Sequence, residues 1–323
     1  MESCMKGEAY VMKSKYPLDP EFSDIKDQTS NNSSRFMLDL GNILLKIQAK
    51  QAKADGVSVT QEDIKIPGYK GKMIKARVFS PASADGKLPC IVNFHGGAFV
   101  GTGMRHQLRY CINFAQYSMC KVIFVDYRLA LRHPFPVPVE DCYAALVWTY
   151  CNAEKLGIDR ERIAVFGDSA GGALAAAVCQ MARDRKTDIP CFQMLIYPVT
   201  DSTQTSESVK RCTDTPQFNS VGNAAMWKYY LADGDHGMPQ YAAPLLASDF
   251  SRLPPAYIET AEFDCLHDEG VAYGEKLRAE GIDVEIYETR GSYHGFDIQE
   301  DREYSKRMLK YRCEVMKRVF YGK

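Results

Sequence analysis

The segment 167–172, Gly-Asp-Ser-Ala-Gly-Gly, combines a hydroxyl group with small neighbours in a setting that favours nucleophilic chemistry. It follows a short apolar run at 163–166 and leads into an alanine-rich helical pattern at 173–177. A serine on so sharp a strand-to-helix turn has a strained backbone, and larger side chains on either side would collide with the adjoining strand and helix. Alanine or glycine would serve a simple helix start equally well, so Ser169 is predicted to be a nucleophile that attacks a carbonyl carbon.

A second turn, at 95–99 (His-Gly-Gly-Ala-Phe), directly follows another apolar run and can supply hydrogen-bond donors. Consecutive small residues let backbone N–H groups turn outward, toward the oxyanion that forms when a serine attacks a carbonyl. We expect Gly97 and Ala98 to donate to this oxyanion, together with Ala170 at the start of the helix after the serine. Gly96 is expected to shape the turn, which completes a predicted oxyanion hole.

Two other interpretations of this glycine turn are weaker. A phosphate-binding loop would be helped by Gly101 and Gly103, but the spacing fits neither the dinucleotide-binding fingerprint nor a Walker loop with its lysine. His95 could be mistaken for a catalytic base, yet a histidine that opens a glycine turn more often hydrogen-bonds nearby backbone. We therefore expect His95 to hold the turn.

The general base is predicted at His294, in the tight segment 291–296 (Gly-Ser-Tyr-His-Gly-Phe) after the last strand-like run. The carboxylate that orients it is expected at Asp264, in the loop after the strand-like run 257–260. Asp268 and Glu269 open the next helical pattern, where the helix dipole and first-turn capping explain them. The chain order serine, aspartate, histidine is that of α/β-hydrolase triads.

Neither metal sites nor disulfides are indicated. The remaining histidines are His106, His133, His236 and His267. None has the convergent carboxylate or thiol spacing of a metal site, so we predict no metal. The chain has 11 cysteines and no Cys-x-x-Cys pair, which fits reduced thiols in a cytoplasm. Cys90 and Cys179 lie in apolar patterns and are expected to be small core residues.

The pattern of apolar residues predicts how these groups are positioned. Strands are expected at 57–66, 73–79, 90–94, 122–127, 163–166, 194–197, 257–260 and 284–287, the first two antiparallel and the others buried and parallel. Helices are expected at about 106–118, 139–156, 170–183, 268–280 and 302–319, with an amphipathic helix at 36–47 whose apolar stripe should cover another part of the protein. This alternation predicts an α/β fold with a mostly parallel sheet.

Composition excludes several classes of function. Apolar residues make up 46% and charged residues 25% of the 323 residues, as in an ordinary globular protein. The net charge is −1 and no basic stripe occurs, so we expect no nucleic-acid partner. The first residues lack the pattern of a signal peptide, and no run is long enough to span a bilayer, which predicts a cytoplasmic protein without membrane insertion.

From 89 to 296 the sequence resembles the hormone-sensitive-lipase-like branch of the α/β-hydrolases, which includes bacterial acetylesterases and relatives of arylacetamide deacetylase. Besides the serine, aspartate, histidine and glycine motifs, the resemblance includes Asp126-Tyr127-Arg128-Leu129-Ala130, His133-Pro134-Phe135-Pro136, Glu140-Asp141, Tyr197-Pro198-Val199-Thr200-Asp201 and Pro244-Leu245-Leu246-Ala247. Ala98 stands where the family usually has a third glycine, and Leu131-Arg132 replace its usual Pro-Glu.

The resemblance implies an α/β-hydrolase fold with helices on both faces of the sheet and a helical cap. The cap would comprise an N-terminal segment, 1–50, and an insertion at about 202–240 into the catalytic domain, 51–323. It also implies a serine carboxylesterase for short-chain acyl esters, acetyl to butyryl, that needs no cofactor, binds a small-molecule ester and allows a homodimer. An amidase or peptidase would use the same triad, and a non-catalytic binding homologue would normally lack one of its members.

Overall fold

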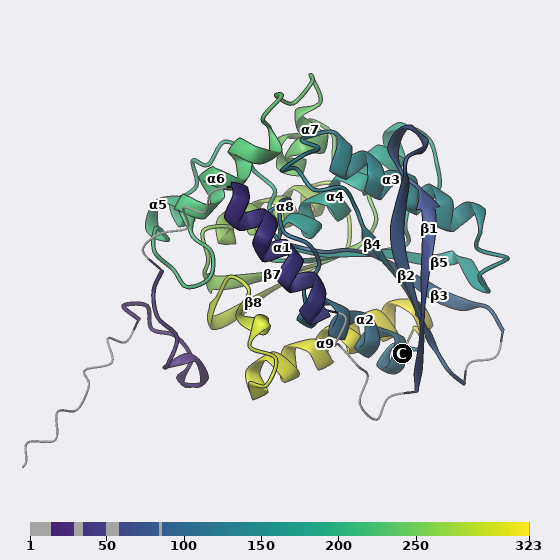
Figure 1. Cartoon of the computed structure of the whole chain (residues 1–323), viewed down its shortest axis with the longest axis horizontal. Helices are drawn as coiled ribbons and strands as arrows, with labels where there is room; N and C mark the ends of the chain where they lie inside the picture. The colour runs from purple at the N-terminus through teal and green to yellow at the C-terminus, as the bar shows by residue number, and fades with distance from the viewer. Residues whose placement is uncertain (1–13, 29–34, 50–57, 84–85, 323) are drawn as a thin grey trace, which may run out of the picture.

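The computed structural model describes residues 14–28, 35–49, 58–83 and 86–322. These residues form a central sheet that carries helices on both faces (Figure 1), so the predicted α/β architecture with a mostly parallel sheet is confirmed. Parts of the predicted N-terminal cap segment, residues 1–13, 29–34 and 50, lie outside the described residues.

The strands are β1 (Val59–Pro67), β2 (Met73–Pro81), β3 (Leu88–Phe94), β4 (Lys121–Asp126), β5 (Ile158–Asp168), β6 (Gln193–Ile196), β7 (Ala256–Phe263) and β8 (Val284–Tyr293). The α-helices are α1 (Arg35–Ala49), α2 (Arg105–Tyr117), α3 (Val137–Cys151), α4 (Ala170–Asp184), α5 (Glu207–Arg211), α6 (Ser220–Tyr230), α7 (Pro239–Ala242), α8 (His267–Ala279) and α9 (Glu303–Tyr321). Four 3₁₀ turns accompany them in the described chain: η1 (Pro20–Phe22), η2 (Tyr69–Gly71), η3 (Pro244–Leu246) and η4 (Phe296–Ile298).

The sheet brings the predicted site residues to one edge. Its strand order is β1-β2-β4-β3-β5-β6-β7-β8, in which β1, β2 and β4 pair antiparallel and the strands from β4 to β8 run parallel. The carboxyl ends of parallel strands lie at the same edge, where open α/β sheets carry their ligand sites. His95, Ser169 and Asp264 each directly follow one of these strands.

The central strands are apolar throughout because both of their faces are covered. Every residue of β3 and β6 is buried. One face packs against α2 and α9 and the other against α3, α4 and α8, which gives one buried apolar cluster on each side. Cys90 and Cys179 are fully buried within these layers, as predicted, and burial raises the pKa of each thiol.

Several elements differ in length from the sequence prediction. β5 begins at Ile158 and β8 continues to Tyr293, because their outer parts carry exposed polar residues that hid them from a search for apolar runs. α3 ends at Cys151 rather than near 156, and the Asn152 side chain donates to the carbonyl oxygen of Trp148 at 2.8 Å, which closes the helix.

The amphipathic helix α1 is present, but its apolar stripe is largely exposed in the described structure. The exposed fractions are 72% for Phe36, 41% for Leu40, 57% for Ile43, 54% for Leu44 and 54% for Ile47. The expectation that this stripe covers another part of the protein is therefore wrong for the described part of the chain, because α1 is attached through Asn42, Asp39 and the partly buried Leu38 instead. None of the described helices is long and apolar enough to cross a membrane.

Candidate active site

Ser169 lies on a sharp turn between β5 and α4, as the sequence predicts. Its backbone has φ 55° and ψ −120°, a conformation that an L-residue adopts only when the surroundings impose it. A Cβ atom on Gly171 would lie 1.9 Å from the carbonyl oxygen of Phe94, and one on Gly167 would lie 2.0 Å from the carbonyl oxygen of Gly171. The glycines therefore allow β3, β5 and α4 to approach closely enough to form this turn.

The structure brings Ser169, His294 and Asp264 into one hydrogen-bonded chain. His294 Nε2 lies 2.9 Å from Ser169 Oγ, and His294 Nδ1 lies 2.7 Å from Asp264 Oδ2. The other carboxylate oxygen of Asp264 accepts the Leu266 N–H at 2.9 Å. A carboxylate can only accept, so Nδ1 carries the proton and Nε2 is left free to accept from the serine hydroxyl. This is the arrangement that activates a serine for attack.

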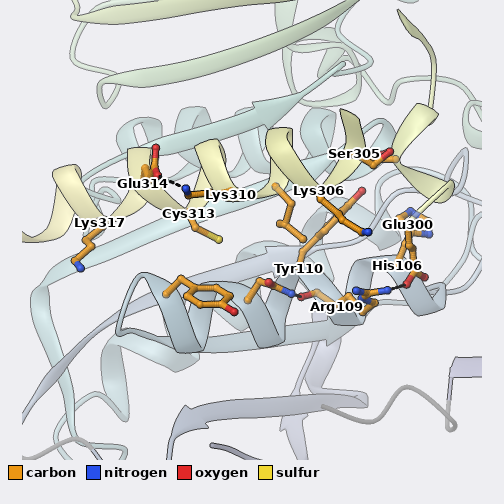
Figure 2. A pocket seen from close by; sticks show the side chains of 14 residues that line it. His106, Arg109, Tyr110, Glu300, Ser305, Lys306, Lys310, Cys313, Glu314 and Lys317 are labelled. Atoms are coloured by element: carbon orange, nitrogen blue, oxygen red, sulfur yellow. Dashed lines mark hydrogen bonds and ion pairs between the residues drawn. The ribbon is translucent and has the colours of Figure 1, made fainter. Parts of the chain in front are cut away.

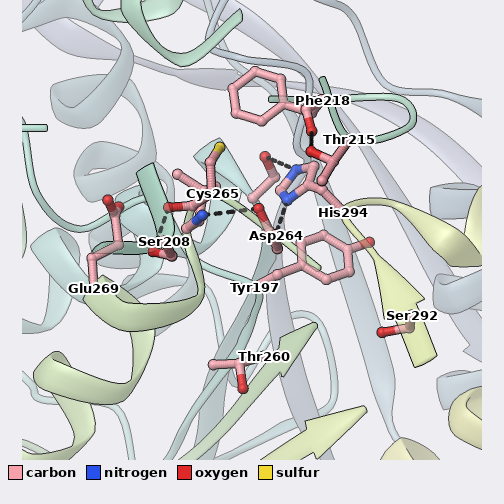
Figure 3. Close-up of polar contacts among 12 residues, drawn as sticks. Tyr197, Ser208, Thr215, Phe218, Thr260, Asp264, Cys265, Glu269, Ser292 and His294 are labelled. Carbon is pink, nitrogen blue, oxygen red and sulfur yellow. Dashed lines mark hydrogen bonds and ion pairs between the residues drawn. The ribbon is translucent and has the colours of Figure 1, made fainter. Parts of the chain in front are cut away.

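The imidazole of His294 is held between two aromatic rings (Figure 3). The ring centre of Tyr197, just after β6, is 4.6 Å from that of His294, and the ring centre of Phe218 is 4.9 Å away on the other side. Phe218 belongs to the predicted cap insertion, and its carbonyl oxygen accepts from the Thr215 hydroxyl at 2.9 Å. Ser169, His294 and Asp264 are all buried.

The turn after β3 presents unpaired backbone donors. Gly97, Ala98 and Phe99 all have positive φ angles, 115°, 55° and 58°. Within the described part of the chain, the N–H groups of Gly97, Ala98 and Ala170 have no hydrogen-bond acceptor. Ala98 retains the donor that the family's third glycine would provide. These three amides are therefore available to an oxyanion.

Gly96 differs from the other three predicted residues, because its N–H donates to Asp168 Oδ1 at 3.0 Å. It shapes the turn and supplies no free donor. Asp168 Oδ2 accepts from Gln107 Nε2 at 2.7 Å, so this carboxylate joins the serine turn, the glycine turn and α2. Burial raises the pKa of Asp168 to about 6, although the hydrogen bonds from Gln107 and Gly96 oppose this shift.

His95 holds the glycine turn rather than taking part in the chain with Ser169. Its Nδ1 lies 2.8 Å from the carbonyl oxygen of Gly96, and its ring stacks on Tyr127 with 4.3 Å between centres. The Tyr127 hydroxyl donates to the carbonyl oxygen of His95 at 2.7 Å. The structural role expected from the sequence is the one observed.

Residues far away in the sequence support the same turn. Asn42 of α1 donates to the carbonyl oxygen of Val100 at 2.9 Å and accepts the Thr102 N–H at 2.8 Å. Arg132, one of the two departures from the family pattern, pairs with Asp39 of the same helix at 2.9 Å. The other departure, Leu131, is buried in the core.

The alternative carboxylates have other partners. Asp268 accepts the Ser208 N–H at 2.8 Å, and Glu269 accepts the Thr200 N–H at 2.6 Å. Burial raises the pKa of Glu269 well above its usual value. Their place in the first turn of α8 is therefore only part of the explanation, because they also attach the segment between β6 and α6 to that helix.

Two further observations concern the surroundings of the site. No group of three or more His, Cys, Asp and Glu side chains in the described ranges is arranged to hold a metal ion.

A groove of about 540 Å³ lies between α2 and α9 (Figure 2). Its lining includes His106, Tyr110 and Asp297 but not Ser169 or His294.

Sequence reasoning missed several residues that position the site. Gln107, Asn42 and Phe218 carry no recognisable motif, and their contacts join segments that are distant in the sequence. Asp168 and Tyr197 lie inside recognisable motifs, but spacing alone does not show what their side chains contact.

The fold and these contacts define a class of enzyme: a hydrolase with a serine at a strand–helix turn at the carboxyl edge of an α/β sheet. Residues 91–298 match a protein family described as "alpha/beta hydrolase fold", and residues 8–126 match the acetyl xylan esterase family. The chain belongs to the α/β-hydrolase family, in its hormone-sensitive-lipase-like branch.

Several relatives of this chain are named esterases. Esterase LipI of Mycobacterium tuberculosis is 38% identical over 237 residues, which cover 72% of this chain and 74% of that protein. An arylesterase of Saccharolobus solfataricus is 32% identical over 292 residues, which cover 87% of this chain and 92% of the relative. The structure of a bacterial heroin esterase superposes with a TM-score of 0.84 at 33% identity, over 94% of this chain and 98% of that one.

Proposed function

We propose that this chain hydrolyses short-chain carboxylic esters, acetyl to butyryl, with Ser169 as nucleophile, His294 as general base and Asp264 as the orienting acid. At the coarser level, it is an enzyme of the carboxylic ester hydrolase class, like its relatives. The observation that carries the finer proposal is the hydrogen-bonded chain from Ser169 Oγ through His294 to Asp264.

In the acylation step, Ser169 Oγ attacks the ester carbonyl carbon while His294 Nε2 takes the hydroxyl proton. The carbonyl oxygen becomes an oxyanion, which the N–H groups of Gly97, Ala98 and Ala170 stabilise by hydrogen bonds. When the tetrahedral intermediate collapses, the C–O bond to the leaving group breaks. The imidazolium of His294 then gives its proton to the departing alcohol.

In the deacylation step, a water molecule takes the place of the alcohol. His294 Nε2 accepts a proton from the water as its oxygen attacks the acyl carbon, and the same donors stabilise the second oxyanion. Collapse releases the carboxylic acid and returns the proton to Ser169 Oγ. The carboxylate of Asp264 stabilises the imidazolium in both steps and keeps its own charge.

The proposed substrate class is supported by the acyl groups and alcohols that name the relatives. An ethyl acetate hydrolase of Pseudomonas putida is 35% identical over 240 residues, which cover 72% of this chain and 74% of that protein. We also propose that the described part of 1–50 and the insertion at 202–240 act as a cap. The contact of Phe218 with His294 and the bonds of Asn42 to the glycine turn support that role.

The proposal is tested with Ser169→Ala on a graded series of p-nitrophenyl esters, with a p-nitroanilide included. We expect the wild-type protein to favour acetate to butyrate over longer chains and over the anilide. The variant should lose at least about 10³-fold in kcat, on the scale of other triad knockouts. It should keep its melting temperature, since the Ser169 N–H to Ile196 carbonyl bond at 2.8 Å does not involve the hydroxyl.

Ser208→Ala is the matched control, because this buried serine bonds the Cys265 carbonyl oxygen at 2.8 Å and lies outside the Ser169–His294 chain. It should retain turnover. Full activity in Ser169→Ala would reject the nucleophile, and preference for the anilide would assign the site to amides instead.

A further inference from the structure

Tyr197 is held against His294 in an unusual backbone conformation. It directly follows β6, and its φ of 35° lies in the left-handed region that non-glycine residues rarely adopt. Its N–H donates to the carbonyl oxygen of Glu259 on β7 at 2.6 Å, and its side chain is almost completely buried. Such a conformation persists only where the surroundings over-determine it, and it places the phenol ring 4.6 Å from the imidazole of His294, measured between ring centres.

The hydroxyl of Tyr197 links its side chain to the turn that carries His294. It donates to Asp297 Oδ1 at 2.7 Å, and Asp297 lies in η4, the 3₁₀ turn that follows His294 in the chain. His294 and Asp297 are thus close in the chain, Asp297 is hydrogen-bonded to the Tyr197 hydroxyl, and the aromatic ring of Tyr197 packs against the imidazole of His294. Rotation or displacement of the imidazole toward Tyr197 is therefore opposed by a side chain that the same turn fixes.

The far side of Asp297 is fixed by a buried arginine. Arg312 of α9 donates through Nη1 to Asp297 Oδ2 at 2.7 Å and is completely buried. Its Nε donates to Glu259 Oε2 at 3.0 Å, and its Nη2 donates to the other oxygen of that carboxylate. Burial alone would raise the pKa of Asp297, but Arg312 holds it below the usual value, so Asp297 is a charged acceptor for the Tyr197 hydroxyl.

The buried ion pairs of Glu259, Asp297 and Arg312 do not by themselves imply a gain in the stability of the fold. Buried ion pairs lose their hydration, and well-packed apolar residues often replace them without loss of stability. What such ion pairs do provide is a fixed geometry, because bidentate and charge-assisted hydrogen bonds hold both partners in one orientation. Asp297 also lines the groove between α2 and α9. Figure 2 shows Tyr110 in the same groove, so this anchoring lies close to the surface of the protein.

We infer that Tyr197 and Asp297 are positioning residues for His294: the Tyr197 hydroxyl, fixed by Asp297, holds the phenol ring that keeps the imidazole aligned between Ser169 and Asp264. The inference rests on the proposed role of His294 as general base. It predicts that loss of the Tyr197 hydroxyl, whose hydrogen bond is to Asp297 and not to Ser169, His294 or Asp264, lowers turnover.

The test compares Tyr197→Phe with Tyr293→Phe in the full-length protein. Both variants remove one buried phenol hydroxyl, but among the described residues the Tyr293 hydroxyl has no hydrogen-bond partner. We expect Tyr197→Phe to lower kcat for p-nitrophenyl acetate roughly ten- to hundred-fold with KM within about twofold, because a small misplacement of a catalytic group has effects of this size. Tyr293→Phe should remain within about twofold of wild type in both constants.

A second readout is independent of turnover. The Nδ1 proton shared by His294 and Asp264 is followed by its downfield NMR signal, which should shift or broaden in Tyr197→Phe and stay in place in Tyr293→Phe. Wild-type kinetics and an unchanged signal in Tyr197→Phe would overturn the positioning role while the proposed esterase function stands. If the wild-type protein cleaves no ester, the esterase proposal fails and the NMR comparison alone decides whether Tyr197 positions the imidazole. Equal losses in both variants would also overturn the inference, since they would show only that this core tolerates no lost hydroxyl.

Discussion

At the scale of single residues, the two oxygens of Asp264 have different partners, and this difference decides what a substitution does. Oδ2 faces His294 Nδ1 and Oδ1 accepts the Leu266 N–H. Both partners donate, so the group at position 264 must accept twice. Only a carboxylate can do this, because an amide offers one oxygen and one NH₂ group.

Asp264→Asn should therefore put the proton of His294 on the wrong nitrogen. The Leu266 N–H requires the amide oxygen, which turns the NH₂ toward Nδ1 and leaves the imidazole proton on Nε2, facing Ser169. We expect kcat to fall by about 10⁴, the size of the loss that the equivalent Asp→Asn change causes in serine proteases. Asp268→Asn is the control: this side chain is partly exposed, and the amide oxygen of asparagine can still accept the Ser208 N–H, so the change should cost at most about 1 kcal/mol of stability and leave kcat nearly unchanged. A dead Asp268→Asn beside an active Asp264→Asn would mean that the acid is misassigned.

Asp168 should make the stability of the protein depend on pH in a recognisable window. Its pKa is raised by burial from 3.8 to about 6, so the folded state binds a proton more tightly than the unfolded state does. The stabilisation is complete below pH 4 and is lost as the pH rises through 6, a change on the order of 3 kcal/mol. Asp168→Asn cannot titrate and should lack this change.

The measurement is urea denaturation of both proteins at pH 4, 5, 6 and 7. The free energy of unfolding of the wild type, minus that of Asp168→Asn, should decrease from pH 4 to 6 and then level off. Asp159→Asn is the control for the direction of this pH dependence, because the hydrogen bond with Arg162 lowers the pKa of Asp159 instead of raising it. A difference that stays constant or grows with pH for Asp168→Asn would contradict the prediction.

At the scale of elements, the sequence predicted every strand of the described sheet but not the full length of each. Apolar runs mark only the buried middle of a strand, so the run 257–260 stood for β7, which extends to Phe263. Asp264 therefore follows the strand directly instead of lying further along a loop. The nucleophile turn was predictable because local steric demands fix its residue types, whereas the bond between Asp168 and Gly96 joins two turns that only the folded sheet brings together.

Helix α1 also shows what the sequence pattern can and cannot predict. Its periodicity correctly predicted a helix, since an apolar stripe recurs at helical spacing. Periodicity does not say which face docks. Asn42 and Asp39 find specific partners in Thr102 and Arg132, and these bonds attach the polar face while the stripe remains exposed.

At the scale of the whole molecule, the N-terminal region contacts both halves of the candidate site. The Asp19 N–H donates to the carbonyl oxygen of Gly291 at 2.8 Å, just before the turn that carries His294. Phe22 is fully buried against Tyr293, with ring centres 5.4 Å apart. Asn42 holds the glycine turn that presents the oxyanion donors. The N-terminal region thus contacts both the last residues of β8, which lead to His294, and the turn that follows β3.

A chain that begins at residue 51 should therefore lose both stability and activity. Removal of Phe22 alone opens a cavity in the apolar cluster beneath β8, which costs about 3–5 kcal/mol for a buried aromatic side chain. Loss of the Asn42 bonds frees the turn at Gly97 and Ala98, so kcat should fall by at least about tenfold even where the truncated chain is folded. The measurements are the melting temperature and the kinetics on acetate and butyrate esters. Phe22→Ala and Asn42→Ala in the full-length chain separate the two effects, since the first should act mainly on melting temperature and the second mainly on kcat. A truncated chain with wild-type melting and wild-type kinetics on both esters would show that the N-terminal region supports neither turn.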